Sequence, residues 1–424
     1  MLLLTKNKYD KINREGLCIG CGLCESIGKE KGYLMNLSSK GFYEPIRTKG
    51  RDAKVEKQIS AVCPAINLYA PQIKDNLVWG NINAFYNVSS KDTEVRNEGS
   101  SGGGLSAMCI YLLENKIVDA ILHIGKIEGE TIENKLFVSR DRGAVIRNAS
   151  SRYAPSRTFN ELKDILDRGT EIFAFVGKPC DIAGIKNYLS VNTDYQNRIA
   201  YFFSFFCAGM PSYNATSQLL ERANEPEPPY FLKYRGGGWP GYFFAKFKND
   251  KAIKITYRES WGKVLGRQLH ARCKICPDGI GMMADIVYAD AWETKDGYPD
   301  FEEKEGVSLA IARTTAGELL LQKALNDGSI MAEPVASERI EKMQPYQYQR
   351  RLAVGYRILA VQFLTDGLLN FNGTGYMKLM RQYPIVKGLK NTLGTLKRFL
   401  ADSRKRTRDK KLYHNKPTKR VAPE

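Results

Sequence analysis

The stretch Cys18-Ile19-Gly20-Cys21-Gly22-Leu23-Cys24 places three cysteines at intervals of three residues, and Cys63-Pro64 follows later in the chain. Three thiolates at this spacing, on a loop loosened by two glycines, can wrap three irons of one cubane. The fourth iron then takes a remote cysteine, often one that precedes proline. Cys18, Cys21, Cys24 and Cys63 therefore predict a [4Fe-4S] cluster.

Zinc is the main alternative to an iron-sulfur cluster as the metal bound by these thiols. Structural zinc sites usually take two separated Cys-x2-Cys pairs rather than a triplet and one distant cysteine. A reading in which the cysteines are merely buried small residues has to account for three thiols within seven positions. The nine cysteines of the chain favour metal binding over disulfides if the protein resides in a reducing compartment.

The pattern along the chain changes twice and predicts three regions. Residues 1–75 have short apolar runs among turn formers, which predicts a small ferredoxin-like domain stapled by the cluster. Residues 76–335 alternate between strand-like and helix-like runs, which predicts a mixed-sheet α/β domain, so the fold class is α/β of mixed α+β character. Residues 336–424 are rich in helix formers and basic residues, which predicts a helical basic extension.

Individual elements follow from the apolar patterns. Strands are expected at Asn83 to Val88, Asp119 to Gly125, Glu171 to Val176 and Ala200 to Phe206. Helices are expected at Gly104 to Asn115, Phe159 to Asp167, Arg357 to Leu369 and Leu389 to Leu400.

A second set of cysteines comes from the α/β region. Cys180 and Cys207 each follow a predicted buried strand, at the edge where open α/β sheets bind ligands. Cys273 and Cys276 form a further Cys-x2-Cys pair, closed by Pro277. The four thiols together predict a second [4Fe-4S] cluster. The alternative is core packing of Cys180 and Cys207 with a free or zinc-bound pair at 273 and 276, and Cys109, inside an apolar helix, is expected to be core.

A glycine-rich loop, Arg96-Asn-Glu-Gly-Ser-Ser-Gly-Gly-Gly104, precedes the helix expected from Gly104. Amides at a helix N-terminus, with small residues that allow close approach, suit a phosphate or pyrophosphate. The loop matches neither a P-loop nor a Gly-x-Gly-x-x-Gly fingerprint, so a Rossmann-type NAD site is unsupported. A flexible surface loop remains the alternative.

The order of these motifs resembles the coenzyme F-420 hydrogenase/dehydrogenase beta-subunit family over roughly residues 10–335. The matching pieces are Cys18 to Cys24 with Cys63-Pro64, Arg96 to Gly103, Ser151 to Ser156, Gly177 to Gly184, Cys207 to Ser212, Tyr234-Arg235 with Gly238-Trp239, Cys273 to Pro277, Asp285 to Trp292, and Gly306 to Gly317.

The resemblance implies an oxidoreductase that binds FAD and one or two [4Fe-4S] clusters. It implies that the FAD phosphates are held by Asn97, Ser100, Ser101, Gly102 and Gly103, and that the flavin pocket is lined by Arg152, Tyr153 and Lys178. Electrons would pass between a ferredoxin or other redox protein and a two-electron small-molecule substrate. Relatives act on a deazaflavin or on quite different substrates, and many bacterial members sit in surface-polysaccharide gene sets, so the substrate does not transfer.

Two other functions remain open beside an FAD-dependent iron-sulfur reductase. One is a non-catalytic electron-carrier or adaptor subunit of a larger redox complex, and the other is a zinc-stabilised basic nucleic-acid binder. Three histidines in the whole chain disfavour histidine-rich metal or triad chemistry, although His270, close to Cys273, could face a substrate or a cluster. Arg235 and Trp239 could form a cationic and aromatic wall for an anionic planar substrate, or a tight turn with a packed ring.

The net charge of +18 is concentrated partly in the tail from Ala401 to Glu424. This tail is expected to be a solvated, poorly ordered end, or else to dock on an acidic protein or anionic lipid. No sequence-specific nucleic-acid motif is present. No apolar run is long enough to span a membrane, and Met1 to Leu4 are too short for a signal peptide, which favours a cytoplasmic protein that could form oligomers.

Overall fold

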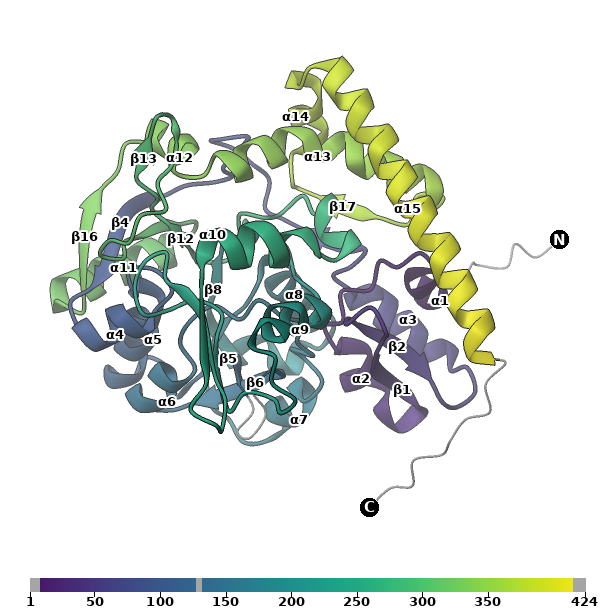
Figure 1. Ribbon diagram of the computed structural model, residues 1–424, viewed down its shortest axis with the longest axis horizontal. Helices are drawn as coiled ribbons and strands as arrows, with labels where there is room; N and C mark the ends of the chain where they lie inside the picture. Colours follow the sequence, from purple (N-terminus) through teal and green to yellow (C-terminus); the bar gives the residue numbers. More distant parts are fainter. Residues whose placement is uncertain (1–7, 127–131, 415–424) are drawn as a thin grey trace.

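A computed structural model describes residues 8–126 and 132–414, with side chains as far as Ser403. Its centre is a mixed sheet whose four inner strands run parallel and whose outer strands run antiparallel (Figure 1). In spatial order the eight strands are β16 (Ile330–Pro334), β4 (Ala84–Ser90), β15 (Ser308–Ala312), β12 (Ile286–Asp290), β8 (Ile199–Phe205), β7 (Phe173–Val176), β5 (Ala120–Lys126) and β6 (Asn134–Ser139).

Alternation along the strands supplies a core on each face of this sheet. In β7, Phe173 and Phe175 point to one core while Ala174 points to the other, as the two-residue repeat of a strand requires. One face is covered by α5 (Gly104–Glu114), α6 (Arg142–Arg147) and α11 (Thr315–Asp327). The opposite face packs on α8 (Pro179–Val191), on the cysteine loop and on α13 (Pro345–Leu364).

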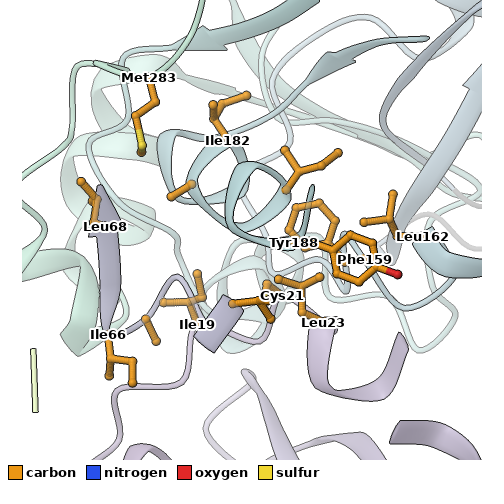
Figure 2. Close-up of a cluster of buried hydrophobic side chains, with 14 of the residues drawn as sticks. Ile19, Cys21, Leu23, Ile66, Leu68, Phe159, Leu162, Ile182, Tyr188 and Met283 are labelled. Carbon is orange, nitrogen blue, oxygen red and sulfur yellow. The ribbon is translucent and has the colours of Figure 1, made fainter. Parts of the chain in front are cut away.

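The N-terminal unit is built around a hairpin and three helices. Its elements are α1 (Lys8–Arg14), α2 (Leu23–Gly28), β1 (Tyr33–Leu37), β2 (Tyr43–Arg47), α3 (Ala53–Val62) and β3 (Asn67–Tyr69). It shares its hydrophobic core with the main domain, because Ile19, Cys21 and Leu23 pack in one cluster with Ile182 and Tyr188 of α8 (Figure 2). The first cysteine loop is therefore fixed against the sheet domain by apolar packing.

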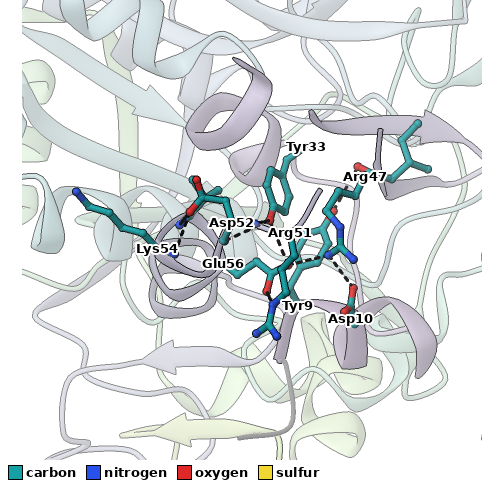
Figure 3. Close-up of polar contacts among 10 residues, drawn as sticks. Tyr9, Asp10, Tyr33, Arg47, Arg51, Asp52, Lys54 and Glu56 are labelled. Atoms are coloured by element: carbon teal, nitrogen blue, oxygen red, sulfur yellow. Dashed lines mark hydrogen bonds and ion pairs between the residues drawn. The ribbon is translucent and has the colours of Figure 1, made fainter. Parts of the chain in front are cut away.

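A buried carboxylate organises the polar side of the N-terminal unit (Figure 3). Glu56 of α3 accepts hydrogen bonds from Tyr33 Oη at 3.1 Å, Arg47 at 2.7 Å and Arg51 at 2.7 Å. Asp52 caps the same helix by accepting from the amides of its first turn. A buried carboxylate is stable only with such partners, so Glu56 ties the hairpin to α3.

The remaining elements complete the rim of the sheet and the C-terminal part of the chain. A three-stranded sheet comprises β9 (Phe231–Lys233), β10 (Tyr242–Lys246) and β11 (Ala252–Thr256), and a short hairpin comprises β13 (Thr294–Lys295) and β14 (Tyr298–Pro299). Further helices are α4 (Thr93–Glu98), α7 (Leu162–Asp167), α9 (Tyr213–Leu220), α10 (Tyr257–Glu259), α12 (Glu338–Met343), α14 (Tyr376–Gln382) and α15 (Ile385–His414).

The C-terminal region returns to the N-terminal unit. β17 (Asn370–Asn372) pairs in parallel with β3, and Lys11 of α1 forms an ion pair with Asp366 at 3.0 Å. Arg351 of α13 is buried and donates to the carbonyl oxygens of Leu77 and Pro277. The part of the chain predicted as an extension thus packs against both other regions, while the predicted domain boundaries themselves stay a prediction.

The mixed α/β fold class is confirmed, and most expected elements lie within a few residues of their positions. The helix expected from Arg357 to Leu369 begins earlier, at Pro345, and ends at Leu364, because Asp366 and Gly367 adopt positive φ angles that a helix cannot continue through. The tail expected to be poorly ordered from Ala401 is helical as far as His414. Residues 415–424 and the short apolar run at Met1 to Leu4 lie outside the described residues.

Removal of the buried carboxylate tests the packing of the N-terminal unit. Glu56→Ala should lower the free energy of unfolding by about 2–4 kcal/mol, since Arg47, Arg51 and the Tyr33 hydroxyl lose a shared acceptor. Urea denaturation monitored by circular dichroism measures this loss. The matched control is Asp10→Ala, which removes a half-exposed carboxylate from Arg47 and should cost less than about 1 kcal/mol. Equal losses in the two variants would contradict the role assigned to Glu56.

Candidate functional site at the carboxyl edge of the sheet

A cavity of about 690 Å³ opens at the carboxyl ends of the parallel strands. Val176 of β7, Phe205 of β8 and Asp290 of β12 all line it, each at the last position of its strand. Residues that follow these strands, including Gly177, Lys178 and Phe206 to Pro211, complete this wall. This is the edge at which open α/β sheets bind ligands, and the volume lies within the range of small-molecule and cofactor sites.

The glycine-rich loop meets the cavity where α5 begins. Gly103, with a φ of 70°, precedes the helix and gives it no side-chain cap. The first residues of the helix, Gly104, Leu105 and Ser106, line the cavity. Their amides are among those that a helix leaves unbonded, and they carry the positive end of its dipole. This wall can therefore bind a phosphate group.

The five residues predicted to hold phosphates do not all face the cavity. Ser100, Ser101 and Gly103 line it. Asn97 is exposed on α4 and is not part of the lining. Gly102 instead serves packing, because a Cβ there would lie 2.6 Å from the carbonyl oxygen of Val88.

The three residues predicted for the flavin pocket, Arg152, Tyr153 and Lys178, all line the cavity. Arg152 donates to Asn134 Oδ1 at 2.6 Å, and burial lowers its pKa. Tyr153 packs on Trp261 with ring centroids 4.7 Å apart. Burial alone would lower the pKa of Lys178, but Asp181, which accepts from its Nζ at 2.6 Å, raises it together with the neighbouring thiols. Lys178 therefore stays a cation at the cavity wall.

Two buried polar groups in the cavity wall lack a hydrogen-bond partner in the described part of the chain. They are the hydroxyl of Tyr288 on β12 and Oε1 of Gln347 on α13. A Cβ on Gly104 would lie 3.4 Å from the Tyr288 ring, so this ring adjoins the start of α5. Buried polar groups are normally paired, and these two are satisfied if a polar ligand occupies the cavity. The motif Asp285 to Trp292 contains Tyr288, whereas no sequence pattern indicated Gln347.

Arg235 belongs to the lining of the cavity, whereas Trp239 does not. The Arg235 guanidinium is buried and makes a two-pronged contact with Asp290 at 2.7 and 2.9 Å, so its charge is already paired. Trp239 stacks on Trp292 at 4.7 Å and does not line the cavity. Arg235 also lies 4.9 Å from the Tyr257 ring, and both residues line the cavity. These residues brace one aromatic end of the cavity.

The first thiol group, Cys18, Cys21, Cys24 and Cys63, lines a separate small cavity. Apart from the cysteines, its walls are mainly apolar and include Ile12, Ile19 and Met35. Burial raises the pKa of each thiol, and neighbouring thiols of the group raise it further for Cys18, Cys21 and Cys24. The Gly20 amide donates to Cys18 Sγ at 3.4 Å. The fold thus brings Cys63 and the three cysteines of the N-terminal loop together around one apolar cavity.

The second thiol group, Cys180, Cys207, Cys273 and Cys276, also converges. Burial raises the pKa of the Cys180 thiol, and it raises that of Cys207 to about 12. The neighbouring thiols Cys207 and Cys276 also raise the pKa of Cys180, and Cys273 and Cys276 also raise that of Cys207. The Met210 amide donates to Cys273 Sγ at 3.4 Å. Cys207 also lines the large cavity, so this group adjoins the cavity wall.

Two buried arginines hold the loops of the thiol groups, and sequence reasoning missed both roles. Arg350 of α13 donates to the carbonyl oxygen of Cys207 at 2.9 Å and to that of Cys273. Arg272 donates to the carbonyl oxygens of Ala65 at 2.6 Å and Pro64 at 3.4 Å. Arg272 thereby connects the two thiol groups. Only its position beside Cys273 could have indicated this role.

The two remaining candidate residues, Cys109 and His270, make packing or backbone contacts. Cys109, on α5, is buried in the core, as expected, although it also contributes to the cavity lining. His270 does not line the cavity, and its Nδ1 accepts from the Arg272 amide at 3.1 Å. Within residues 8–126 and 132–414, no group of three or more histidine, cysteine, aspartate or glutamate side chains has an arrangement suited to a single metal ion.

Comparison with known families covers the α/β region. Residues 85–163 match the N-terminal model of the coenzyme F420 hydrogenase/dehydrogenase beta-subunit family, and residues 170–338 match the C-terminal model of the same family. Together the two models cover more than half of the chain. Both models lie in the region that builds the large cavity.

Curated relatives are oxidoreductases or subunits of them. The chain is 24% identical over 360 residues to the coenzyme F420-dependent sulfite reductase of Methanocaldococcus jannaschii. This alignment covers 81% of this chain and 51% of that protein. It is 23% identical over 253 residues to the coenzyme F420 hydrogenase subunit beta of Methanococcus voltae, covering 59% of this chain and 84% of that protein. The chain thus spans about half the length of the sulfite reductase that it matches.

A solved structure shares the fold. It is a chain of the F420-reducing [NiFe] hydrogenase complex from Methanosarcina barkeri, with a TM-score of 0.53 and 18% sequence identity. The match covers 71% of this chain and 99% of that chain.

The buried histidine of the cavity wall should make stability depend on pH. His123 Nε2 lies 2.7 Å from Ser139 Oγ, and burial lowers the pKa of His123 to about 4. As pH falls below about 6.5, His123 becomes protonated in the unfolded chain. In the folded chain it becomes protonated only as pH approaches about 4. Stability from this group is therefore present at neutral pH and is lost as pH falls, by up to about 3 kcal/mol.

Comparison of His123→Gln with the wild type isolates this effect. The stability difference between the two proteins should shrink as pH is lowered from about 7 to about 5, when urea unfolding is followed at each pH. Since glutamine does not titrate, all other pH-dependent groups cancel in the difference. A difference that stays constant over this range would show that His123 titrates normally.

Proposed function

Because the chain belongs to the coenzyme F420 hydrogenase/dehydrogenase beta-subunit family, we propose that it is an FAD-dependent iron-sulfur oxidoreductase. It would pass electrons between a ferredoxin or other redox protein and a two-electron small-molecule substrate, such as a deazaflavin, with surface-polysaccharide metabolism as one setting. The observation that carries the proposal is the contact between cavity and thiols: Cys207 belongs to the second thiol group and to the cavity wall.

The large cavity fits FAD by its chemistry. The uncapped start of α5, with Ser100, Ser101 and Gly103, would hold the phosphates. Arg152, Tyr153 and Lys178 would line the flavin, since they offer cations and an aromatic face on the same cavity. The Tyr288 hydroxyl and Gln347 Oε1 would gain the partners that they lack.

Each thiol group fits a [4Fe-4S] cluster by its donor set. Four thiols, burial and an amide directed at one sulfur are the features that such clusters use. When bound, the clusters and FAD supply single-electron transfer and its conversion to two-electron chemistry. The protein residues position these groups and exclude water: α8 and its apolar neighbours seal the first thiol group, and Arg350 fixes the loops of Cys207 and Cys273.

The second candidate is an electron-carrier or adaptor subunit without a substrate of its own. Relatives named as hydrogenase and formate dehydrogenase subunits favour assembly with other chains. The cavity favours catalysis, because its lining includes aromatic residues, among them Tyr257 and Trp292, besides the residues assigned to FAD. Clusters without flavin would favour the carrier.

Metal analysis of the anaerobically purified protein tests both thiol groups. We expect about eight irons and eight sulfides per chain with one FAD, and about four irons in either Cys21→Ser or Cys276→Ser, because each variant loses one ligand of a cubane. Iron, acid-labile sulfide and released flavin are quantified together with the visible spectrum. The matched control, Cys109→Ser, alters a thiol outside both groups and should retain all irons.

The outcomes separate the alternatives. About four irons with flavin in the wild type would confine the cluster to one thiol group, and the two serine variants would identify it. A colourless protein that carries zinc would overturn the proposal.

Tyr288→Phe tests the cavity independently of the thiols. Loss of the hydroxyl should weaken FAD binding about threefold to tenfold, since one hydrogen bond to the ligand disappears. The same variant should not destabilise the flavin-free protein, because that hydroxyl has no partner in the described chain. Flavin fluorescence titration and thermal unfolding measure the two effects.

The control for this variant is Tyr234→Phe. The Tyr234 hydroxyl lies 2.9 Å from Thr216 Oγ1, and Tyr234 does not line the cavity. The Tyr234→Phe variant should be less stable than the wild type and should bind FAD with unchanged affinity. Unchanged FAD affinity in Tyr288→Phe would contradict the assigned contact.

A further inference from the structure

The long C-terminal helix α15 exposes an apolar stripe. On its inner side, Gly388, Thr395 and Phe399 are buried, and Gly388 permits close contact with the Tyr356 ring of α13. A different apolar stripe, at steps of three and four residues, consists of the exposed Ile385, Leu389, Leu393 and Leu400 and the half-buried Leu396. Ile385 is 70% exposed and Leu393 is 66% exposed.

A neighbouring residue enlarges this surface. Val386 on α15 is 68% exposed and lies beside the stripe on the helix. α15 runs along the outside of the molecule, beside α13 and the N-terminal unit (Figure 1). Five large apolar side chains on one helix face form a contiguous apolar patch, whereas apolar residues on an ordinary protein surface are scattered singly.

Positive charge borders the stripe. Lys387, Lys390 and Lys397 are exposed on α15, and no acidic residue occurs from 385 to 401. On a helix of about 3.6 residues per turn, Lys390 and Lys397 follow directly on the Val386 side of the stripe, while Lys387 lies farther round the helix. The helix therefore has a buried face, an apolar exposed face and a basic face.

We propose that α15 docks this protein on an anionic lipid bilayer, with the apolar stripe in the headgroup region and the lysines at the phosphates. Apolar residues on one face and lysines on the next are the features of interfacial helices. Interfaces between proteins are instead depleted in lysine and enriched in aromatic residues. The complementary charge of anionic headgroups selects this occupant over a second protein.

The dimensions agree with binding in the plane of the membrane. The stripe from Ile385 to Leu400 extends over about 22 Å at the rise of an α-helix. Among the described residues, no helix is long and apolar enough to cross a bilayer. The lysine side chains are long enough to keep their charges at the phosphates while the apolar stripe is immersed.

Vesicle flotation of the full-length, cofactor-loaded protein tests the proposal. We expect flotation with vesicles that contain about one third phosphatidylglycerol, weaker flotation with pure phosphatidylcholine, and loss of binding at about 1 M salt, where the Debye length is short. The charge-reversal variant Lys387→Glu/Lys390→Glu/Lys397→Glu and the apolar variant Leu389→Ser/Leu393→Ser should each reduce the bound fraction by about tenfold or more.

Matched controls come from another exposed helix. Leu319→Ser and Lys323→Glu on α11 change an exposed leucine and an exposed lysine away from α15, and both should float as the wild type does. Circular dichroism and iron content of all variants establish that they are folded and loaded. Absence of wild-type flotation would overturn the proposal in favour of a protein partner. A lower oligomeric mass of the Leu389→Ser/Leu393→Ser variant in light scattering, with flotation unchanged, would assign the stripe to a contact between copies.

Discussion

A buried guanidinium fixes how the two thiol groups lie relative to each other. Arg272 immediately precedes Cys273 and donates to the carbonyl oxygens of Pro64 and Ala65, next to the remote cysteine of the first thiol group. It also lies 4.6 Å from the Phe371 ring. A charge removed from water is stable only while such partners stay in place, so separation of the two loops would strand it. The arrangement of the cavity edge, α8 and the N-terminal unit depends on this contact.

The arginines of α13 extend the same principle. Arg350 and Arg351 are buried and direct their donors to backbone carbonyl oxygens of loops, including those of Cys207 and Pro277. Loop carbonyls lack the partners that strands and helices provide, and a buried guanidinium can bind several at once. A helix outside the matched family region, which ends at residue 338, thus helps to hold the second thiol group.

The features that sequence could predict are those with a local signature. Cysteine spacing and strand patterns predicted which thiols converge and where the cavity edge lies, because the ends of neighbouring parallel strands meet whatever the details of packing. The Tyr288 hydroxyl and Gln347 Oε1, which have no hydrogen-bond partner among the described residues, were not predictable, since a missing partner depends on all surrounding residues. The roles of Arg272 and Arg350 were equally hidden, because arginine has no periodicity that marks burial. Asn97 illustrates the reverse: the family resemblance implied a contact with the FAD phosphates, yet Asn97 is exposed on α4 and outside the cavity lining.

The pairing of β17 with β3 bears on how the protein is made. The register joins Asn370 to Asn67, so the two strands emerge from a ribosome about 300 residues apart. At ordinary synthesis rates of about 5–20 residues per second, the N-terminal unit waits roughly 15–60 s for its last strand. For part of that interval the first cysteine loop also lacks α8, and for longer it lacks Arg272, because both are synthesised after β3 and before β17. Its thiols are therefore accessible to assembly factors and oxidants early in translation, and they become enclosed in steps as first α8, then Arg272 and last β17 pack against the N-terminal unit.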